Sequence, residues 1–369
     1  MTNLLSKNTV DELYGQIEEI VTEKKNKVAY QINNTMLETY FLIGKLIVEN
    51  EQNGNVKAEY GKQVLKELSK RLTQKFGSGF SLTNMKFMRK FYLVYQKGQP
   101  LADQFEKVQK QQPVAVKSDN IQKSQTLSGQ LSWSHYCYLL SIEDDDERSF
   151  YEQECVNSKW SKRELKRQID SCFFQRLLLS TGKNNKEKIL ELSRQGQTIS
   201  KPDDILKEPY VFEFLGIKEN KSLLESDLEK SLINSLPNFL MELGKGFMYV
   251  GNQQRITLDN NIHYYVDLVF YNKILKSYVL IDLKMTDMRP EYVGQMNMYL
   301  NYYNKEIRDE DDNETIGIIL CKGKNEITME YALGGLSNRL FTSTYTYYIP
   351  DKELLIGEVQ KIVRESNNH

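Results

Sequence analysis

The sequence predicts an α+β protein, with an all-helical N-terminal half and a C-terminal α/β domain built on a central mixed sheet. Apolar residues recur at helical spacing through most of the first 180 residues, whereas the later apolar runs are short, β-branched and aromatic. After residue 210 the predicted elements follow the order αβββαβ, which gives a sheet flanked by helices. A chain of 369 residues has room for two or three domains.

Changes in composition indicate where the domains end. We expect a helical domain over residues 1–180, a linker over 181–209 with at most a short helix at 186–193, and the α/β domain over 210–369. Within the first domain, residues 97–129 are polar and rich in glutamine, and they contain two prolines. This composition predicts a flexible loop, because such a segment has few apolar side chains to bury.

Charge and cysteine content exclude several classes of protein. The net charge is -1, so overall charge alone does not indicate a nucleic-acid-binding protein. The four cysteines lack C-x-x-C spacing, which argues against a zinc site or a disulfide framework and favours reduced thiols in a cytoplasmic protein. No signal peptide is recognisable and no apolar run approaches 18 residues, so we expect no membrane span.

The N-terminal half carries a basic region that covers two expected helices and the turn between them. We expect helices from about Asn8, from Ala29 to Glu49 and from Tyr60 to Lys75, and Ser81 should cap another. From residue 57 to 95 there are nine Lys or Arg and two Glu, and the last helix carries Lys86, Arg89 and Lys90. The helix, glycine turn and basic helix resemble a helix-turn-helix that contacts nucleic acid. The alternative is a solvated basic helical hairpin with its aromatic residues in the core.

A second basic stripe follows Ser161, which is expected to form a capping box with Glu164. Its cations either face solvent or contact nucleic acid, and they are Lys162, Arg163, Lys166 and Arg167.

Two apolar runs in the C-terminal half contain charged residues. Asp267 lies in the run 264–271, and Asp282 and Lys284 lie at the end of the run 277–283, which a short polar hairpin loop separates from the first. Asp282 and Lys284 are two residues apart, so both side chains point to one face of the strand. Charges in such apolar runs are costly to bury unless they bind a ligand or each other. The spacing alone also fits a buried Asp–Lys ion pair.

An acid on one strand and acid-x-Lys on the next suits metal-assisted phosphodiester hydrolysis. Asp267 and Asp282 could hold one or two Mg²⁺ ions, which prefer oxygen ligands, and Lys284 could orient a water or stabilise negative charge. On the following helix Gln295 could contact a phosphate or position Lys284, or it could pack on Tyr299 one turn away. On the helix before the sheet Glu229 is either a further ligand or a first-turn acid favoured by the helix dipole.

The C-terminal motifs identify a known family. VDLVF, VLIDLK, PEYVGQMNMYLNYY and TIGIILCKGKNE, in this order, resemble the C-terminal domain of the DUF1016 (YhcG-like) family of the PD-(D/E)xK nuclease superfamily. The resemblance covers nearly the whole chain, and the N-terminal domain of the family resembles a winged-helix or helix-turn-helix region. It implies a restriction-endonuclease-like C-terminal fold. Matched by position, Asp267, Asp282 and Lys284 take the motif places, with Gln295 and Glu229 as accessories. Val266 stands where the nominal motif has proline.

The resemblance implies a Mg²⁺- or Mn²⁺-dependent DNA endonuclease, with the N-terminal domain binding the substrate, in a prokaryotic setting. Because one site cuts one strand, we expect a homodimer for duplex cleavage. Two alternatives stay open. The protein could bind nucleic acid or a partner through a nuclease fold with weak or no activity, or its substrate could be RNA.

Overall fold

The chain folds into two compact units, residues Met1–Leu165 and Lys166–His369. The computed structural model describes residues 2–53, 58–96, 130–181, 185–217, 224–258, 262–324 and 339–366. The flexible loop predicted at 97–129 lies outside the described residues. No helix in the described ranges is long and apolar enough to cross a membrane.

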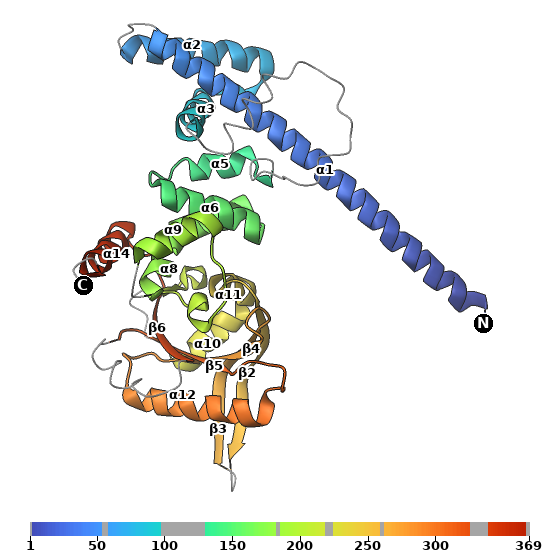
Figure 1. Ribbon diagram of the computed structural model, residues 1–369, viewed down its shortest axis with the longest axis vertical. Helices are drawn as coiled ribbons and strands as arrows, with labels where there is room; N and C mark the ends of the chain where they lie inside the picture. The colour runs from blue at the N-terminus through green and yellow to red at the C-terminus, as the bar shows by residue number, and fades with distance from the viewer. Residues whose placement is uncertain are drawn as a thin grey trace. The chain divides into compact units, whose positions relative to one another are not determined.

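In the described residues of the first unit all regular elements are helical, as predicted (Figure 1). Its elements are α1 (Thr2–Asn53), α2 (Ala58–Phe76), the short η1 (Ser78–Phe80), α3 (Leu82–Tyr95), α5 (Trp133–Leu139) and α6 (Asp145–Ser158). Ser81 caps α3 as expected, because its side chain accepts a hydrogen bond from the Asn84 backbone N–H. The two helices predicted before residue 50 are one continuous helix, since residues 22–30 between them contain no proline or glycine.

The core of the first unit lies where α3 packs between α1 and α5. Met85, Met88 and Phe91 of α3 are fully buried. The Phe91 ring meets Phe41 of α1 edge-on, with ring centroids 6.0 Å apart, and it also meets Trp133 of α5. The helix predicted to contact nucleic acid is therefore also the central packing helix of this unit, and only part of its surface is exposed.

The segment predicted as a linker is part of the second unit, so the boundary falls earlier in the chain than we expected. The basic helix divides into α7 (Lys162–Asp170) and α8 (Phe173–Thr181), because Cys172 adopts a left-handed backbone with φ of 54°. Next come α9 (Asn185–Gln195) and η4 (Pro202–Ile205). Leu192 and Ile205 are each 1% exposed, so the segment 185–205 packs into the fold.

The second unit contains a six-stranded mixed sheet with the order β1-β6-β5-β4-β3-β2. Parallel pairs join β1 to β6, β6 to β5 and β5 to β4, and antiparallel pairs join β4 to β3 and β3 to β2. The two strands of the hairpin begin and end within two residues of the predicted limits. The strands are β1 (Tyr210–Val211), β2 (Phe247–Leu258), β3 (Ile262–Asn272), β4 (Ser277–Leu283), β5 (Ile316–Cys321) and β6 (Leu340–Thr346).

Helices cover both faces of this sheet, which confirms the predicted α/β architecture (Figure 1). On one face α10 (Glu225–Asn234) and α11 (Leu236–Leu243) bury Leu228, Leu232 and Phe239. On the other face α12 (Pro290–Tyr302) buries Val293, Met296 and Leu300. The single helix expected before the sheet is thus two helices, which break at Ser235, just before Pro237. The remaining helical elements are η5 (Glu213–Leu215), η7 (Tyr303–Ile307) and α14 (Lys352–Ser366).

A buried ion-pair cluster joins α7 and α8 to α11. Glu242 is fully buried; its Oε1 accepts from Arg176 Nη1 at 2.5 Å and from the Val211 backbone N–H at 3.0 Å, and its Oε2 accepts from Arg167 Nη2 at 3.1 Å. Burial alone would raise the pKa of Glu242, but Arg176, Lys207 and Arg167 lower it to about 2. The carboxylate therefore stays ionised inside the fold.

Replacing Glu242 with Gln keeps the shape but leaves buried guanidinium groups without their anion. We expect Glu242→Gln to lower the free energy of unfolding by about 3–5 kcal/mol in urea denaturation. Because the pKa of Glu242 is depressed in the folded state, its contribution is present above the unfolded pKa and is lost as pH falls from about 4.5 toward 2. Exposed Glu310→Gln is the matched control. A loss below about 1 kcal/mol would contradict the assignment.

Candidate active site

The site forms where β3 and β4 stop pairing. Their last paired residues are Leu268 and Ile281, and the next residues in register are Asp267 and Asp282. There a side chain replaces a backbone acceptor, because Asp267 Oδ2 accepts the Leu283 backbone N–H at 2.8 Å. This bond fixes one carboxylate at the end of the ladder and sets it beside the other. Asp267 is 9% exposed and Asp282 is 1% exposed.

Lys284 follows directly after β4, and both its backbone and its side chain form polar contacts. Its backbone N–H donates to the Leu320 carbonyl at 2.7 Å, and its own carbonyl accepts from the Tyr345 hydroxyl at 3.1 Å. Its ammonium nitrogen lies 2.8 Å from Asp282 Oδ2 and 3.3 Å from Glu225 Oε1 of α10. Burial alone would lower the pKa of Lys284, but these acids raise it above the usual value. The fold thus presents a fixed cation next to the paired carboxylates.

Asp282 is the most perturbed acid of the site. The pKa of Asp282 is raised to about 7, mainly by burial and secondly by the negative charge of the neighbouring Asp267 carboxylate. Lys284 lowers this pKa but does not cancel the increase. Asp282 Oδ2 lies 2.8 Å from the Lys284 ammonium as an ion pair, and no other described group donates a hydrogen bond to this buried oxygen. A buried carboxylate oxygen beside a second carboxylate suits a divalent cation with oxygen ligands.

The protein ligands available for a cation are few. Within the described ranges, no group of three His, Cys, Asp or Glu side chains is already arranged around one point. The fit therefore rests on Asp267 and Asp282. Two protein carboxylates suffice for Mg²⁺, which commonly keeps several waters in its coordination shell.

Glu229 reaches Asp267 through one intervening side chain. Gln253 Nε2 on β2 donates to Glu229 Oε2 at 2.7 Å and to Asp267 Oδ1 at 3.2 Å. Asn252 Nδ2 donates to the other Glu229 oxygen at 2.9 Å. Gln253 has a φ of 46°, a left-handed backbone that is uncommon for a residue with a side chain. Glu229, which the sequence offered as a metal ligand, therefore lies one side chain away from Asp267.

Gln295 lies on α12 and hydrogen-bonds within its own helix. Its Nε2 donates to the Tyr299 hydroxyl at 2.5 Å, and that hydroxyl donates to the Tyr265 carbonyl of β3 at 3.0 Å. The structure thus favours the predicted alternative in which Gln295 packs on Tyr299 over direct contact with Lys284. Tyr292 of the same helix does reach Lys284, whose ammonium nitrogen lies 5.3 Å from the centre of its ring.

Two polar residues of the site were not singled out from the sequence. Glu225 pairs with Lys284 from the first turn of α10, four residues before Glu229 and on the same helix face. The four-residue spacing was a usable signal for Glu225. Gln253 gave none, because its position depends on the irregular register of β2 and on a left-handed backbone that favours glycine.

The basic residues predicted on α3 are exposed or half-buried along one side of that helix. Lys86 and Lys90 are exposed, and Arg89 forms an ion pair with Glu51 of α1 at 2.8 Å. All three line a groove of the first unit.

The basic stripe predicted on α7 divides into two groups. Lys162 and Arg163 are exposed, and exposed Lys166 pairs with Asp170. Arg167 points inward and bonds Glu213 at 2.7 Å and Glu242 at 3.1 Å. Its prediction as a nucleic-acid contact is corrected, because the helix turns this side chain into the buried ion-pair cluster.

Comparison with known proteins assigns the C-terminal domain to one class, nucleases of the PDDEXK type. Residues 203–360 match the model of the YhcG PDDEXK nuclease domain, and residues 16–176 match that of the DUF1016 N-terminal domain. A protein of Escherichia coli (strain K12) named "Putative nuclease YhcG" is 37% identical over 354 residues, which cover 94% of this chain and 93% of that protein. The chain belongs to this YhcG family.

Two solved structures resemble part of the chain. One is a repair endonuclease from Pyrococcus abyssi, with 16% identity over 34% of this chain and 49% of that one. The other is described as an EndoMS-dsDNA2 complex, with 14% identity over 37% of this chain and 51% of that one. The matches span about half the length of these structures, and both TM-scores are 0.24.

The Gln253 side chain is the link between Glu229 and Asp267, so its removal tests whether that link matters for activity. We expect Gln253→Ala to lower phosphodiester cleavage about 10-fold or more with little loss of stability, because Asp267 and Glu229 lose the amide that joins them. Its exposed neighbour Gln254→Ala is the matched control and should keep full activity. Rates and melting temperatures of both variants check this. Equal rates for the two variants would show that the amide bridge has no role.

Proposed function

We propose that this protein is a Mg²⁺- or Mn²⁺-dependent endonuclease that hydrolyses phosphodiester bonds in DNA. The observation that supports it most is the pair of buried carboxylates, Asp267 and Asp282, next to the Lys284 ammonium at the point where β3 and β4 separate. The membership of the chain in a PDDEXK nuclease family supports the reaction class.

Each residue of the site would have a distinct role. Asp267 and Asp282 would hold the cation, which when bound supplies a Lewis acid for the phosphate and lowers the pKa of a water. Lys284, an ammonium held between Asp282 and Glu225, would stabilise the negative charge that develops on the phosphate or orient the attacking water. Glu229 would position Asp267 through Gln253, and Gln295 would hold Tyr299 against β3.

The N-terminal unit would bind the substrate. Its helix, turn and helix order from α2 to α3 fits a helix-turn-helix, and the exposed cations suit contacts to phosphate rather than to base edges. The proposed phosphate contacts are Lys162 and Arg163, with Lys166 of the second unit beside them on α7. Lys86, Arg89 and Lys90 of α3 line the groove of the first unit and are proposed to contact a second copy of the chain instead. We further propose a homodimer, because one site cuts one strand of a duplex. The free cysteines fit a cytoplasmic protein, and the relative from Escherichia coli supports a prokaryotic setting.

A cleavage assay tests the proposal. Plasmid, linear duplex, single-stranded DNA and RNA are each incubated with Mg²⁺ or Mn²⁺ and with wild type, Asp282→Asn or Lys284→Ala. We expect cutting of DNA that requires the metal and falls at least 100-fold in both variants. Lys273→Ala, an exposed lysine in the loop of the same hairpin, should cut as wild type does.

Other outcomes of this assay decide between the alternatives. Cutting of RNA alone would keep the chemistry and change the substrate. Absence of cutting, with equal nucleic-acid binding by wild type and both variants, would overturn the enzyme and leave a binding protein. Melting temperatures near that of wild type show that the variants are folded.

The proposed phosphate contacts of α7 are tested through salt. If Lys162 and Arg163 each contact a phosphate, their replacement by Ala weakens duplex binding and lowers the slope of log K against log salt by about 2 in total. Fluorescence anisotropy over a range of salt concentrations measures this slope. Lys305→Ala, an exposed lysine of η7, should leave it unchanged. An unchanged slope in the double variant would remove α7 from the binding surface.

A further inference from the structure

Helix α1 is much longer than the core on which it packs. Its 52 residues span about 78 Å at 1.5 Å per residue. Leu37, Phe41 and Val48 in its C-terminal part are buried in the first unit. The part before them projects away from α2, α3 and α5 (Figure 1), and residues 10–29 are exposed. A projecting helix of this length needs a partner surface, because most helical stability in proteins comes from packing of an apolar face.

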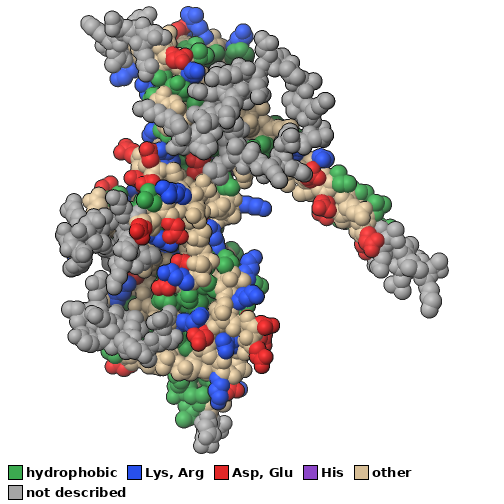
Figure 2. All heavy atoms as spheres, in the orientation of Figure 1, with side chains coloured by type: hydrophobic (Ala, Val, Ile, Leu, Met, Phe, Trp, Pro, Cys, Tyr) green, Lys and Arg blue, Asp and Glu red, His purple; other side chains and the backbone are tan. Residues whose placement is uncertain are grey.

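The projecting part carries an apolar stripe, which Lys24 and Lys25 interrupt between Val21 and Val28. At about 100° per residue, its exposed apolar side chains fall within one side of the helix. Ile43 and Leu46, farther along α1, lie in the same sector. Figure 2 shows hydrophobic and acidic side chains close together along this part. The apolar residues are Val10, Leu13, Tyr14, Ile17, Ile20, Val21, Val28, Ile32 and Met36, and each is between 39% and 64% exposed.

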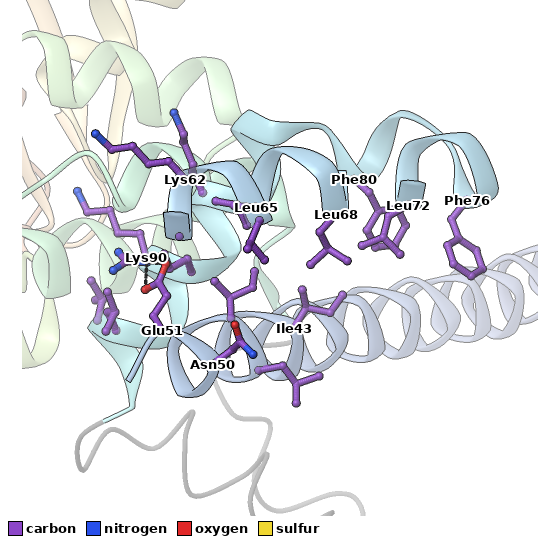
Figure 3. A pocket seen from close by; sticks show the side chains of 18 residues that line it. Ile43, Asn50, Glu51, Lys62, Leu65, Leu68, Leu72, Phe76, Phe80 and Lys90 are labelled. Atoms are coloured by element: carbon purple, nitrogen blue, oxygen red, sulfur yellow. Dashed lines mark hydrogen bonds and ion pairs between the residues drawn. The ribbon is translucent and has the colours of Figure 1, made fainter. Parts of the chain in front are cut away.

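The stripe leads into an apolar groove of about 1440 Å³ between α1 and α2. Leu65, Leu68 and Leu72 point from α2 toward Ile43 of α1 across this groove (Figure 3). Leu46 and Phe76 line it and are 66% and 60% exposed, so the groove is open to solvent. Its charged lining residues are mostly basic, namely Lys62, Lys86, Arg89 and Lys90 against the single acid Glu51.

The charges of the projecting helix complement those of the groove. Residues 10–23 contain five acids and no Lys or Arg. Asp11 and Glu18 lie seven residues apart along one edge of the apolar stripe. An acidic helix with an apolar stripe matches an apolar groove with a basic rim in both respects. A nucleic acid would match the rim but not the apolar floor.

Residues 10–23 cannot reach the groove of their own chain. Ile17 and Leu46 are 29 residues apart on one continuous helix, which separates them by about 44 Å. A second copy of the chain can supply the segment. If two α1 helices lie antiparallel around a two-fold axis near Ile32, each acidic segment reaches the groove of the other copy, because a two-fold contact is reciprocal.

We propose that residues 10–23 of α1 from a second copy of this chain occupy the groove between α1 and α2, so that two copies exchange their N-terminal helices. The inference rests on the homodimer in the proposed function and identifies its surface. It is independent of the cleavage chemistry.

Sedimentation of the full chain tests the surface. Wild type should be a dimer, and Ile17→Asp with Val21→Asp should raise the dimer dissociation constant at least 10-fold. Asn26→Asp adds a charge on the opposite side of α1 and is the matched control, which should remain dimeric. Because all three side chains are exposed, circular dichroism should show folded proteins.

A charge exchange identifies the two sides of the contact. One variant carries Asp11→Lys with Glu18→Lys, and the other carries Lys86→Glu with Lys90→Glu. Each should be monomeric alone, and an equal mixture should form dimers, because both grooves then meet a segment of opposite charge.

Different results would overturn the dimer and the groove as its interface. Wild type that is monomeric at all concentrations overturns this inference and the dimer, while cleavage by Asp282→Asn and wild type still tests the nuclease. A wild-type dimer that survives Ile17→Asp with Val21→Asp, or a charge-exchange mixture that stays monomeric, overturns the groove as the interface.

Discussion

The hydrogen bond from the Leu283 backbone N–H to Asp267 Oδ2 is the contact on which the site depends. In a regular antiparallel ladder that N–H would donate to a backbone carbonyl of β3, and the two acids would lie within the paired part of the sheet. Here β3 and β4 separate after Leu268 and Ile281, so Asp267 and Asp282 lie together at the opening. Two buried like charges raise the free energy of the folded state, and Lys284 offsets part of this cost.

The sheet makes this arrangement rigid. Parallel β5 and β6 hold the backbone of Lys284 through the Leu320 carbonyl and the Tyr345 hydroxyl. Helices from both faces reach the same lysine, α10 with Glu225 and α12 with Tyr292. A lysine side chain is flexible when free, so these contacts reduce the entropy that would be lost on binding a phosphate.

Much of the second unit could be predicted from its sequence, because the β3–β4 hairpin consists of two short apolar runs joined by a polar turn. The site could be predicted because the charged residues Asp267, Asp282 and Lys284 stand out in or beside these apolar runs. Gln253 could not, since its place depends on an irregular strand register and a positive φ. Arg167 was mistaken for a surface cation because helical spacing gives a side chain its direction but not its neighbour, here the buried Glu242. The segment expected to be a linker is part of the folded second unit, because Leu192 and Ile205 are buried there.

Direct binding of metal tests the central claim, that Asp267 and Asp282 form a cation site, without relying on a substrate. Mn²⁺ is titrated calorimetrically into wild type, Asp282→Asn and the control Asp312→Asn. Asp312 accepts from the hydroxyl of Tyr271, near the C-terminal end of β3. We expect saturable binding to wild type and the control, and at least 10-fold weaker binding to folded Asp282→Asn. Equal binding by all three proteins would contradict the account.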